Sequence, residues 1–88
     1  MTASITRVQL ETLQAVSRGE VSKVNHTGAD FGTWRIGGYR GRAVTVPVEA
    51  LLRKELARLA DEPVDGRLYA TATPAGTAEL SKAAHRRH

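Results

Sequence analysis

The chain contains no cysteine, and it has few aromatic residues: one tryptophan, one phenylalanine and two tyrosines among 88 residues. Without thiols, neither a disulfide framework nor a thiolate-bound metal site is available. The apolar runs are only a few residues long, which excludes a membrane-spanning helix. The N-terminus has neither the basic nor the apolar region of a secretory signal, and we therefore expect a cytoplasmic protein.

The charge balance is basic, with 13 Lys and Arg against 9 Asp and Glu, and it is unevenly distributed. Residues 35–58 carry six basic side chains against two acidic ones, whereas residues 59–81 carry one basic side chain against four acidic ones. Residues 82–88 add three more basic side chains. Because clustered cations attract phosphates, the middle of the chain is the candidate for nucleic-acid contact, and a solvated basic face is the alternative.

Capping signals predict a first helix from about Arg7 to Arg18. Thr6 and Gln9 fit a capping box at its start, and Gly19 is a natural stop at its end. Leucine and valine recur along the segment at helical spacing. We expect this helix to have a structural role.

The following segment has no helical period and predicts strands and turns. Residues 20–24 and 31–36 form an antiparallel hairpin in this interpretation, with Trp34 in the core. A flexible, glycine-rich basic turn follows at residues 37–42. Residues 43–46 are either a third short strand or the approach to the next helix.

A second helix is predicted from about Val46 or Pro47 to Leu59, with Thr45 as its N-cap. Apolar residues at helical spacing would form its buried stripe, namely Val48, Leu51, Leu52, Leu56 and Leu59. The polar side of this helix carries several cations, which favours contact with an anion.

The last third of the chain predicts a turn, a strand and a helix. Asp65-Gly66 is a strong turn dipeptide, and residues 67–73 form the strand that follows. Thr73-Pro74 supplies the cap and first residue of a third helix, which is alanine-rich and ends at about Arg86.

This order of elements resembles the winged-helix DNA-binding domains of MarR- and PadR-like bacterial regulators. The resemblance rests on the leucine-striped helix, the Asp65-Gly66 turn and the helix start Thr73-Pro74-Ala75-Gly76. It implies that Pro47–Arg58 is a recognition helix, that Asp65-Gly66 is the tip of the wing, and that Arg67 lies near that tip.

The sequence departs from that family in two places. A hairpin and glycine turn stand where the family has its second helix, and the wing carries Asp61, Glu62 and Asp65, which phosphates would repel. We therefore predict that the basic turn and the helix make most DNA contacts. The candidate DNA-binding residues are Arg35, Arg40, Arg42, Thr45, Glu49, Arg53, Lys54, Arg58 and Arg67.

No pattern in the sequence predicts catalysis or metal binding. A Ser–His–Asp set, a carboxylate pair and a phosphate-binding glycine loop are all missing. The three histidines, His26, His85 and His88, lack the partners of a metal site. We expect neither an enzyme nor a cofactor.

The sequence thus predicts one α+β, winged-helix-like domain over residues 1–81, with three helices and small antiparallel β-ribbons, and a frayed basic tail at 82–88. The predicted function is sequence-specific or architectural binding of double-stranded DNA by a small bacterial or mobile-element transcriptional regulator, with a homodimer as the expected assembly. Two alternatives stay open. One is a protein-interaction module on the same scaffold, and the other is an RNA or single-strand binder that uses the Gly-Tyr-Arg-Gly-Arg turn at 38–42.

Overall fold

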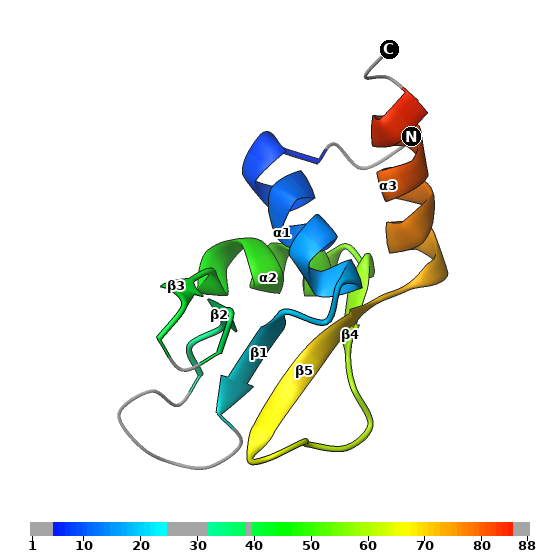
Figure 1. Ribbon diagram of the computed structural model, residues 1–88. Coiled ribbons are helices and arrows are strands. Elements are labelled where there is room, and N and C mark those ends of the chain that lie inside the picture. Colours follow the sequence, from blue (N-terminus) through cyan, green and yellow to red (C-terminus); the bar gives the residue numbers. More distant parts are fainter. Residues whose placement is uncertain (1–4, 25–31, 39, 86–88) are drawn as a thin grey trace.

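A computed structural model describes residues 5–24, 32–38 and 40–85, in which three helices accompany one five-stranded antiparallel sheet (Figure 1). The elements are α1 Arg7–Ser17, β1 Val21–Val24, β2 Arg35–Ile36, β3 Arg42–Ala43, α2 Thr45–Arg53, β4 Ala57–Leu59, β5 Arg67–Ala72 and α3 Pro74–His85. The strand order is β3-β2-β1-β5-β4, so the predicted α+β class is confirmed. No described helix has the length and hydropathy that crossing a membrane requires.

Several predictions concern parts of the chain outside the described residues. These parts are the turn at 25–30 with His26, Phe31, Tyr39, the side chain of His85 and the last three residues of the predicted tail at 82–88, whose first four residues belong to α3. The predicted pairing of the first hairpin is confirmed where it is described, because Val21 lies opposite Ile36 in the β1–β2 ladder.

The first helix begins and ends as predicted. The hydroxyl of Thr6 accepts the Gln9 N–H at 3.1 Å, and the Gln9 side chain accepts the Thr6 N–H at 3.3 Å, which completes the capping box. At the other end, Gly19 adopts a φ of 74° and its N–H donates to the carbonyl of Val16, while the next N–H donates to that of Ala15. These two bonds form a Schellman motif with glycine in the left-handed position.

The second helix is shorter than predicted. It ends at Arg53, and the prediction that it continues to Leu59 was wrong. The N–H of Glu55 donates to the carbonyl of Leu52 at 3.1 Å, and the following N–H donates to that of Leu51 at 3.0 Å. This is the same Schellman motif that ends α1, but Glu55, with a φ of 59°, takes the position that usually holds glycine.

The early end of α2 redistributes the residues of the predicted stripe. Leu56 is buried in the core directly after the turn. Leu59 instead lies on β4 and is 42% exposed. Arg58 also lies on this strand, so its predicted place on a recognition helix was wrong.

The start of α2 is hydrogen-bonded to Trp34, the residue just before β2. Thr45 is not the N-cap that we predicted, because Val44 holds that position and makes no side-chain capping bond. The hydroxyl of Thr45 instead accepts the backbone N–H of Trp34 at 3.0 Å, and the carbonyl of Trp34 accepts the Val44 N–H at 2.7 Å. The predicted core position of Trp34 is confirmed: its side chain is 2% exposed, with Lys23 Nζ 5.1 Å from the ring centroid.

A two-residue turn closes the β4–β5 hairpin. Asp65 and Gly66 have φ values of 51° and 75°, as a type I′ turn requires. Val64 and Arg67, on either side, exchange both backbone hydrogen bonds at 2.8 and 2.9 Å. The predicted turn is confirmed.

The third helix begins against the end of α2. The hydroxyl of Thr73 accepts the Gly76 N–H at 3.0 Å, which confirms the predicted cap, and donates to the carbonyl of Glu55 at 2.7 Å. A Cβ added at Gly76 would clash with the carbonyl oxygen of Leu56. Only glycine allows this approach, so the first turn of α3 is held directly on the turn that ends α2.

One face of the sheet packs against the helices. Strand residues that share this face by register, including Val21, Ala57 and Ala70, belong to the same buried cluster as Leu13 of α1 and Leu51 of α2. Helix α1 contacts both α2 and α3 (Figure 1). The core is therefore a single layer of side chains between the three helices and one side of the sheet.

We predict that Glu55→Gly raises the free energy of unfolding by about 0.5–1 kcal/mol, because glycine adopts a left-handed φ without the steric cost of a side chain. The matched control is Glu49→Gly, which places glycine in the exposed interior of α2 and is expected to cost about 1 kcal/mol. Chemical denaturation measures both. If Glu55→Gly lost as much stability as the control, the left-handed backbone conformation at this residue would be contradicted.

Candidate nucleic-acid interface

Some of the nine predicted site residues make hydrogen bonds within the protein, and others face solvent. Arg67 belongs to the first group. Its Nε donates to Ser22 Oγ at 2.7 Å, and its Nη2 donates to the Ser22 carbonyl at 3.3 Å, across the β1–β5 pair. Because Ser22 is completely buried, Arg67 supplies the donors for a polar residue that water does not reach.

Lys54 and Arg35 also make hydrogen bonds within the protein. Lys54 Nζ donates to Gln9 Oε1 at 2.7 Å and so joins the end of α2 to the start of α1. Arg35 Nη1 donates to the carbonyl of Gly41 at 3.0 Å and thereby braces the β2–β3 turn. Both side chains are partly buried, and a ligand that bound them would have to replace these hydrogen bonds.

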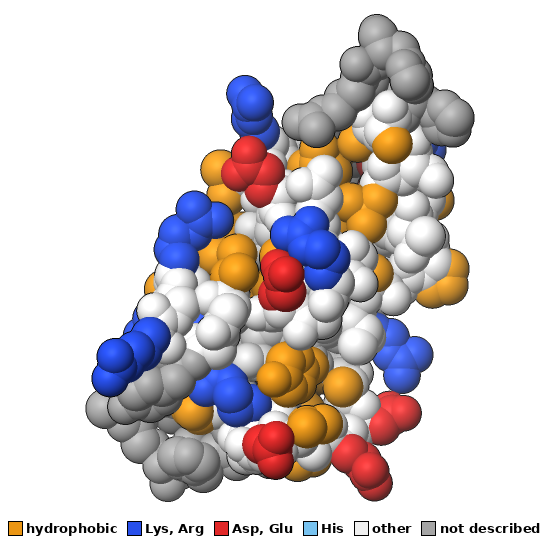
Figure 2. All heavy atoms as spheres, in the orientation of Figure 1, with side chains coloured by type: hydrophobic (Ala, Val, Ile, Leu, Met, Phe, Trp, Pro, Cys, Tyr) orange, Lys and Arg blue, Asp and Glu red, His pale blue; other side chains and the backbone are white. Residues whose placement is uncertain are grey.

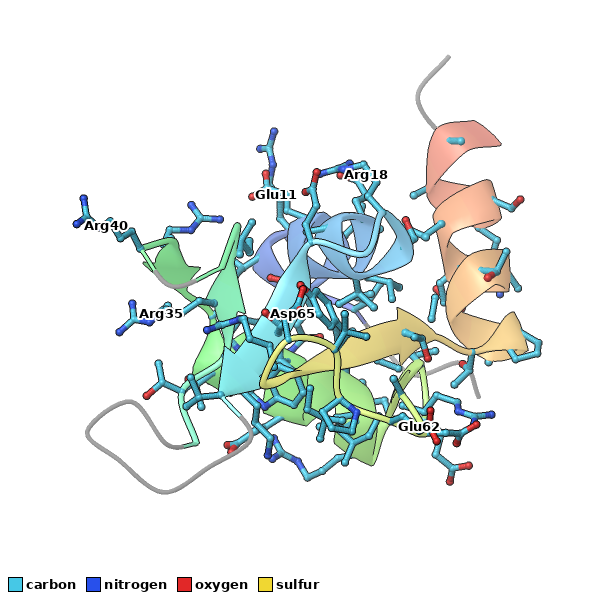
Figure 3. All side chains as sticks on the ribbon, turned by 60° about the horizontal axis from the view of Figure 1, so that its bottom comes forward. Glu11, Arg18, Arg35, Arg40, Glu62 and Asp65 are labelled. Atoms are coloured by element: carbon cyan, nitrogen blue, oxygen red, sulfur yellow. The ribbon has the colours of Figure 1, made fainter. Side chains whose placement is uncertain are left out.

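Three arginines have no such bonds. Arg40 in the β2–β3 turn, Arg42 on β3 and Arg53 at the end of α2 are exposed, and none makes a hydrogen bond or ion pair with another described residue. Figure 3 shows Arg40 projecting outward from the β2–β3 side of the molecule. Their positive charges are therefore not neutralised by the described part of the chain.

The exposed side of α2 connects these arginines. Val46, Glu49 and Arg53 are three and four residues apart, so they form one stripe on the helix, opposite the buried Val48 and Leu51. Val46 is 76% exposed, the highest value among the exposed large hydrophobic residues of the described chain. We define the basic strip as Arg40, Arg42, Val46, Glu49 and Arg53.

The β2–β3 ribbon does not place all its cations on one side. Arg35 lies opposite Ala43, and Arg42 lies opposite Ile36. Partners in register share a face and neighbours along a strand alternate, so Arg35 and Arg42 point to opposite faces. Of the arginines on this ribbon, only the two from the predicted basic turn, Arg40 and Arg42, join the strip, whereas Arg35 points to the other face.

The β4–β5 hairpin carries the opposite charge. Asp61, Glu62 and Asp65 are all exposed, and we call them the acidic loop. Arg58 Nη2 lies 3.4 Å from Asp61 Oδ1, an exposed pair that compensates one of these charges weakly. On the face shown in Figure 2, acidic side chains gather below β4, and basic side chains lie along the β3 side. Strands β3 and β4 are the two opposite edges of the sheet.

Sequence reasoning missed Val46 as a surface residue, because the predicted helix began at this position. Once α2 is limited to Thr45–Arg53, the spacing of Val46, Glu49 and Arg53 identifies the exposed stripe. The signal was therefore present, but it depended on the position at which the helix begins.

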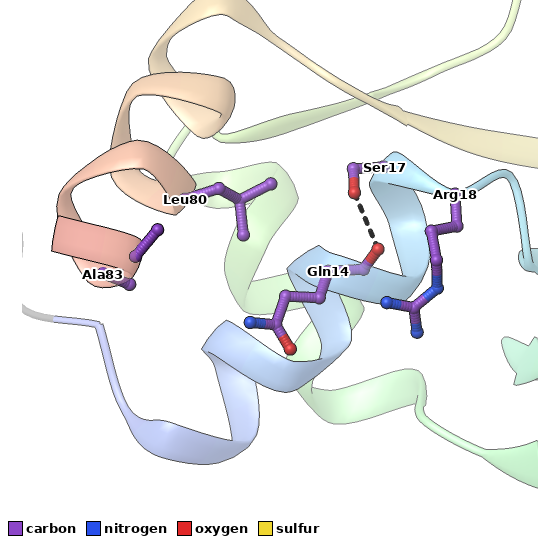
Figure 4. A pocket seen from close by; sticks show the side chains of 6 residues that line it. Gln14, Ser17, Arg18, Leu80 and Ala83 are labelled. Carbon is purple, nitrogen blue, oxygen red and sulfur yellow. Dashed lines mark hydrogen bonds between the residues drawn. The ribbon is translucent and has the colours of Figure 1, made fainter. Parts of the chain in front are cut away.

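A pocket also lies between α1 and α3 (Figure 4), lined by Gln14, Ser17, Arg18, Leu80, Ala83 and Ala84. The Ser17 hydroxyl donates to the Gln14 carbonyl at 2.7 Å, and Arg18 pairs with Glu20 at 3.2 Å. The lining therefore offers no pair of groups for acid–base or nucleophilic chemistry. Within the described ranges, no cluster of three or more His, Cys, Asp or Glu side chains is arranged to hold a metal ion.

Comparisons with protein-family models, curated proteins and solved structures found no match to this chain. Inferences about function therefore rest on the basic strip, the acidic loop and the fold that positions them.

We predict that Arg67→Ala lowers the free energy of unfolding by about 1–2 kcal/mol, because the buried Ser22 hydroxyl loses its hydrogen-bond partner. The matched control, Arg42→Ala, removes an exposed arginine and is expected to change stability by no more than about 0.5 kcal/mol. Urea denaturation of both variants gives the comparison. Equal losses of stability would contradict the distinction between arginines that are hydrogen-bonded within the protein and arginines that are exposed.

Proposed function

We propose that the protein binds double-stranded DNA through the basic strip. The observation that carries the proposal is the set of three exposed arginines, Arg40, Arg42 and Arg53, along β3 and the solvent side of α2. Cations that the described part of the chain does not neutralise are available to phosphates, and release of the DNA counterions makes such binding favourable and salt-dependent.

The strip combines side chains suited to the backbone with side chains suited to base edges. Nine helical residues span about 13 Å, close to the width of the DNA major groove. With α2 in that groove, Val46 is placed for a thymine methyl group and Glu49 for a cytosine amino group. Arg40 and Arg42, on the preceding ribbon, then contact phosphates and fix the orientation.

The order of elements supports a winged-helix interpretation of this binding mode. Helix α2 leads into the β4–β5 hairpin, and Thr73-Pro74 then starts α3, as the resemblance implies. The β2–β3 ribbon stands in place of the second helix. In this interpretation the hairpin is the wing, and the acidic loop at its tip keeps it off the phosphates.

The specific role we propose is that of a small cytoplasmic transcriptional regulator, bacterial or from a mobile element, that forms a homodimer on DNA. A dimer would place two α2 helices on successive major grooves. The supporting observation is the small size of the strip, since a nine-residue helix and three arginines give limited affinity to one copy.

We predict salt-dependent binding to random-sequence duplex DNA that falls sharply in the triple variant Arg40→Ala/Arg42→Ala/Arg53→Ala. Each lost phosphate contact should reduce the slope of log K against log salt by about 0.9, so that the variant loses up to about three units of slope. Fluorescence anisotropy at several salt concentrations gives both quantities.

The matched control is Arg7→Ala/Arg18→Ala/Lys82→Ala, which removes the same charge from cations in ion pairs on α1, the residue after it and α3. It should retain most of the slope. Equal losses in the two variants would show non-specific attraction to net charge and would contradict the proposal. Tighter binding of single strands than of duplex would instead favour the single-strand alternative.

A further inference from the structure

We propose that the acidic loop of one molecule docks on the basic strip of a second copy, so that the chains associate head to tail. The loop presents Glu62 and Asp65, and the strip presents Arg40, Arg42 and Arg53, all exposed. Figure 3 shows Glu62 and Arg40 on opposite sides of the molecule. Glu62 and Arg40 can therefore meet between copies rather than within one.

Apolar side chains accompany both charged surfaces. Large hydrophobic residues with high exposure in the described chain are Val8, Val46, Leu59 and Val64. Leu59 is 42% exposed and comes just before the acidic loop, and Val64 is 57% exposed and lies within it. Val46 lies in the basic strip. An interface of this kind, with an apolar centre and a charged rim, is typical of protein–protein contacts.

The two surfaces are different, so their contact is heterologous. A heterologous contact leaves one free loop and one free strip on every pair, and it therefore builds rings or open chains instead of a closed two-fold dimer. The average mass should then keep rising with protein concentration.

The expected association is weak. Glu49 lies within the strip and Arg58 pairs with Asp61, and both reduce the complementarity. Exposed charge pairs contribute little each and are screened beyond about 10 Å at 0.1 M salt. We therefore expect association at low salt, in roughly the micromolar to millimolar range typical of small interfaces, and its loss at high salt.

Analytical ultracentrifugation of the full chain without DNA tests this proposal directly. The expected result is a mass that rises with concentration at about 0.02 M salt and returns to that of a monomer at about 0.5 M salt. A mass that is constant with concentration, or unchanged by salt, would overturn the proposal. Because no DNA is present, this outcome is independent of the proposed function.

Charge-altered variants identify the surfaces. The loop variant is Glu62→Lys/Asp65→Asn, in which Asn-Gly preserves the type I′ turn, and the strip variant is Arg42→Glu/Arg53→Gln. Each alone should associate at least about tenfold more weakly than the wild type, because attraction becomes repulsion. Their equimolar mixture should regain association, because the lysine introduced in the loop of one variant then meets the glutamate introduced in the strip of the other.

The matched control is Arg7→Glu/Arg18→Gln on and after α1, with the same charge change as the strip variant, and it should associate like the wild type. Denaturation midpoints close to the wild-type value confirm that each variant is folded. Wild-type association by the loop or strip variant, or a mixture no stronger than either variant alone, would overturn the proposal.

Discussion

The turn at Glu55 is the constraint on which the rest of the structure depends. Its left-handed backbone ends α2 after nine residues and turns Leu56 into the core. The chain then enters β4 at the edge of the sheet. Two carbonyl groups at this turn also bind Thr73, at the start of α3. The Glu55 carbonyl accepts the Thr73 hydroxyl, and the Leu56 carbonyl accepts the Thr73 N–H at 3.1 Å. One reversal of the chain therefore fixes α2, the hairpin and α3 relative to each other.

The sequence predicted those elements whose ends depend on residues with a strong local preference. Gly19 identified the end of α1, Asp65-Gly66 identified the hairpin turn, and Thr73 identified the start of α3. The end of α2 uses the same hydrogen bonds as the end of α1, but a glutamate takes the glycine position. Glutamate favours helices, and the leucines beyond it kept the helical spacing, so the local signals indicated continuation where the tertiary packing requires a reversal.

The candidate site was predictable as a region and not as a set of residues. The basic middle of the chain was evident from composition, but which cations are available depends on contacts between distant segments. Lys54 and Gln9 are 45 positions apart, as are Arg67 and Ser22, and no local pattern reports such pairs. The same holds for the two faces of the β2–β3 ribbon, because the strand register decides that Arg35 and Arg42 diverge.

Exposed charges of opposite sign gather in different parts of the molecule: Arg40 and Arg42 at the β3 edge with Arg53 at the end of α2, and the acidic loop after β4. Arginines near β3 and along α2 form a surface suited to phosphates, and the carboxylates after β4 form a surface that phosphates avoid. Backbone amide chemical shifts recorded during titration with a short duplex test this account most directly. We expect the largest changes over residues 40–53, with small changes over 61–65. Changes concentrated in the acidic loop or in α3, or none at saturating DNA, would contradict it.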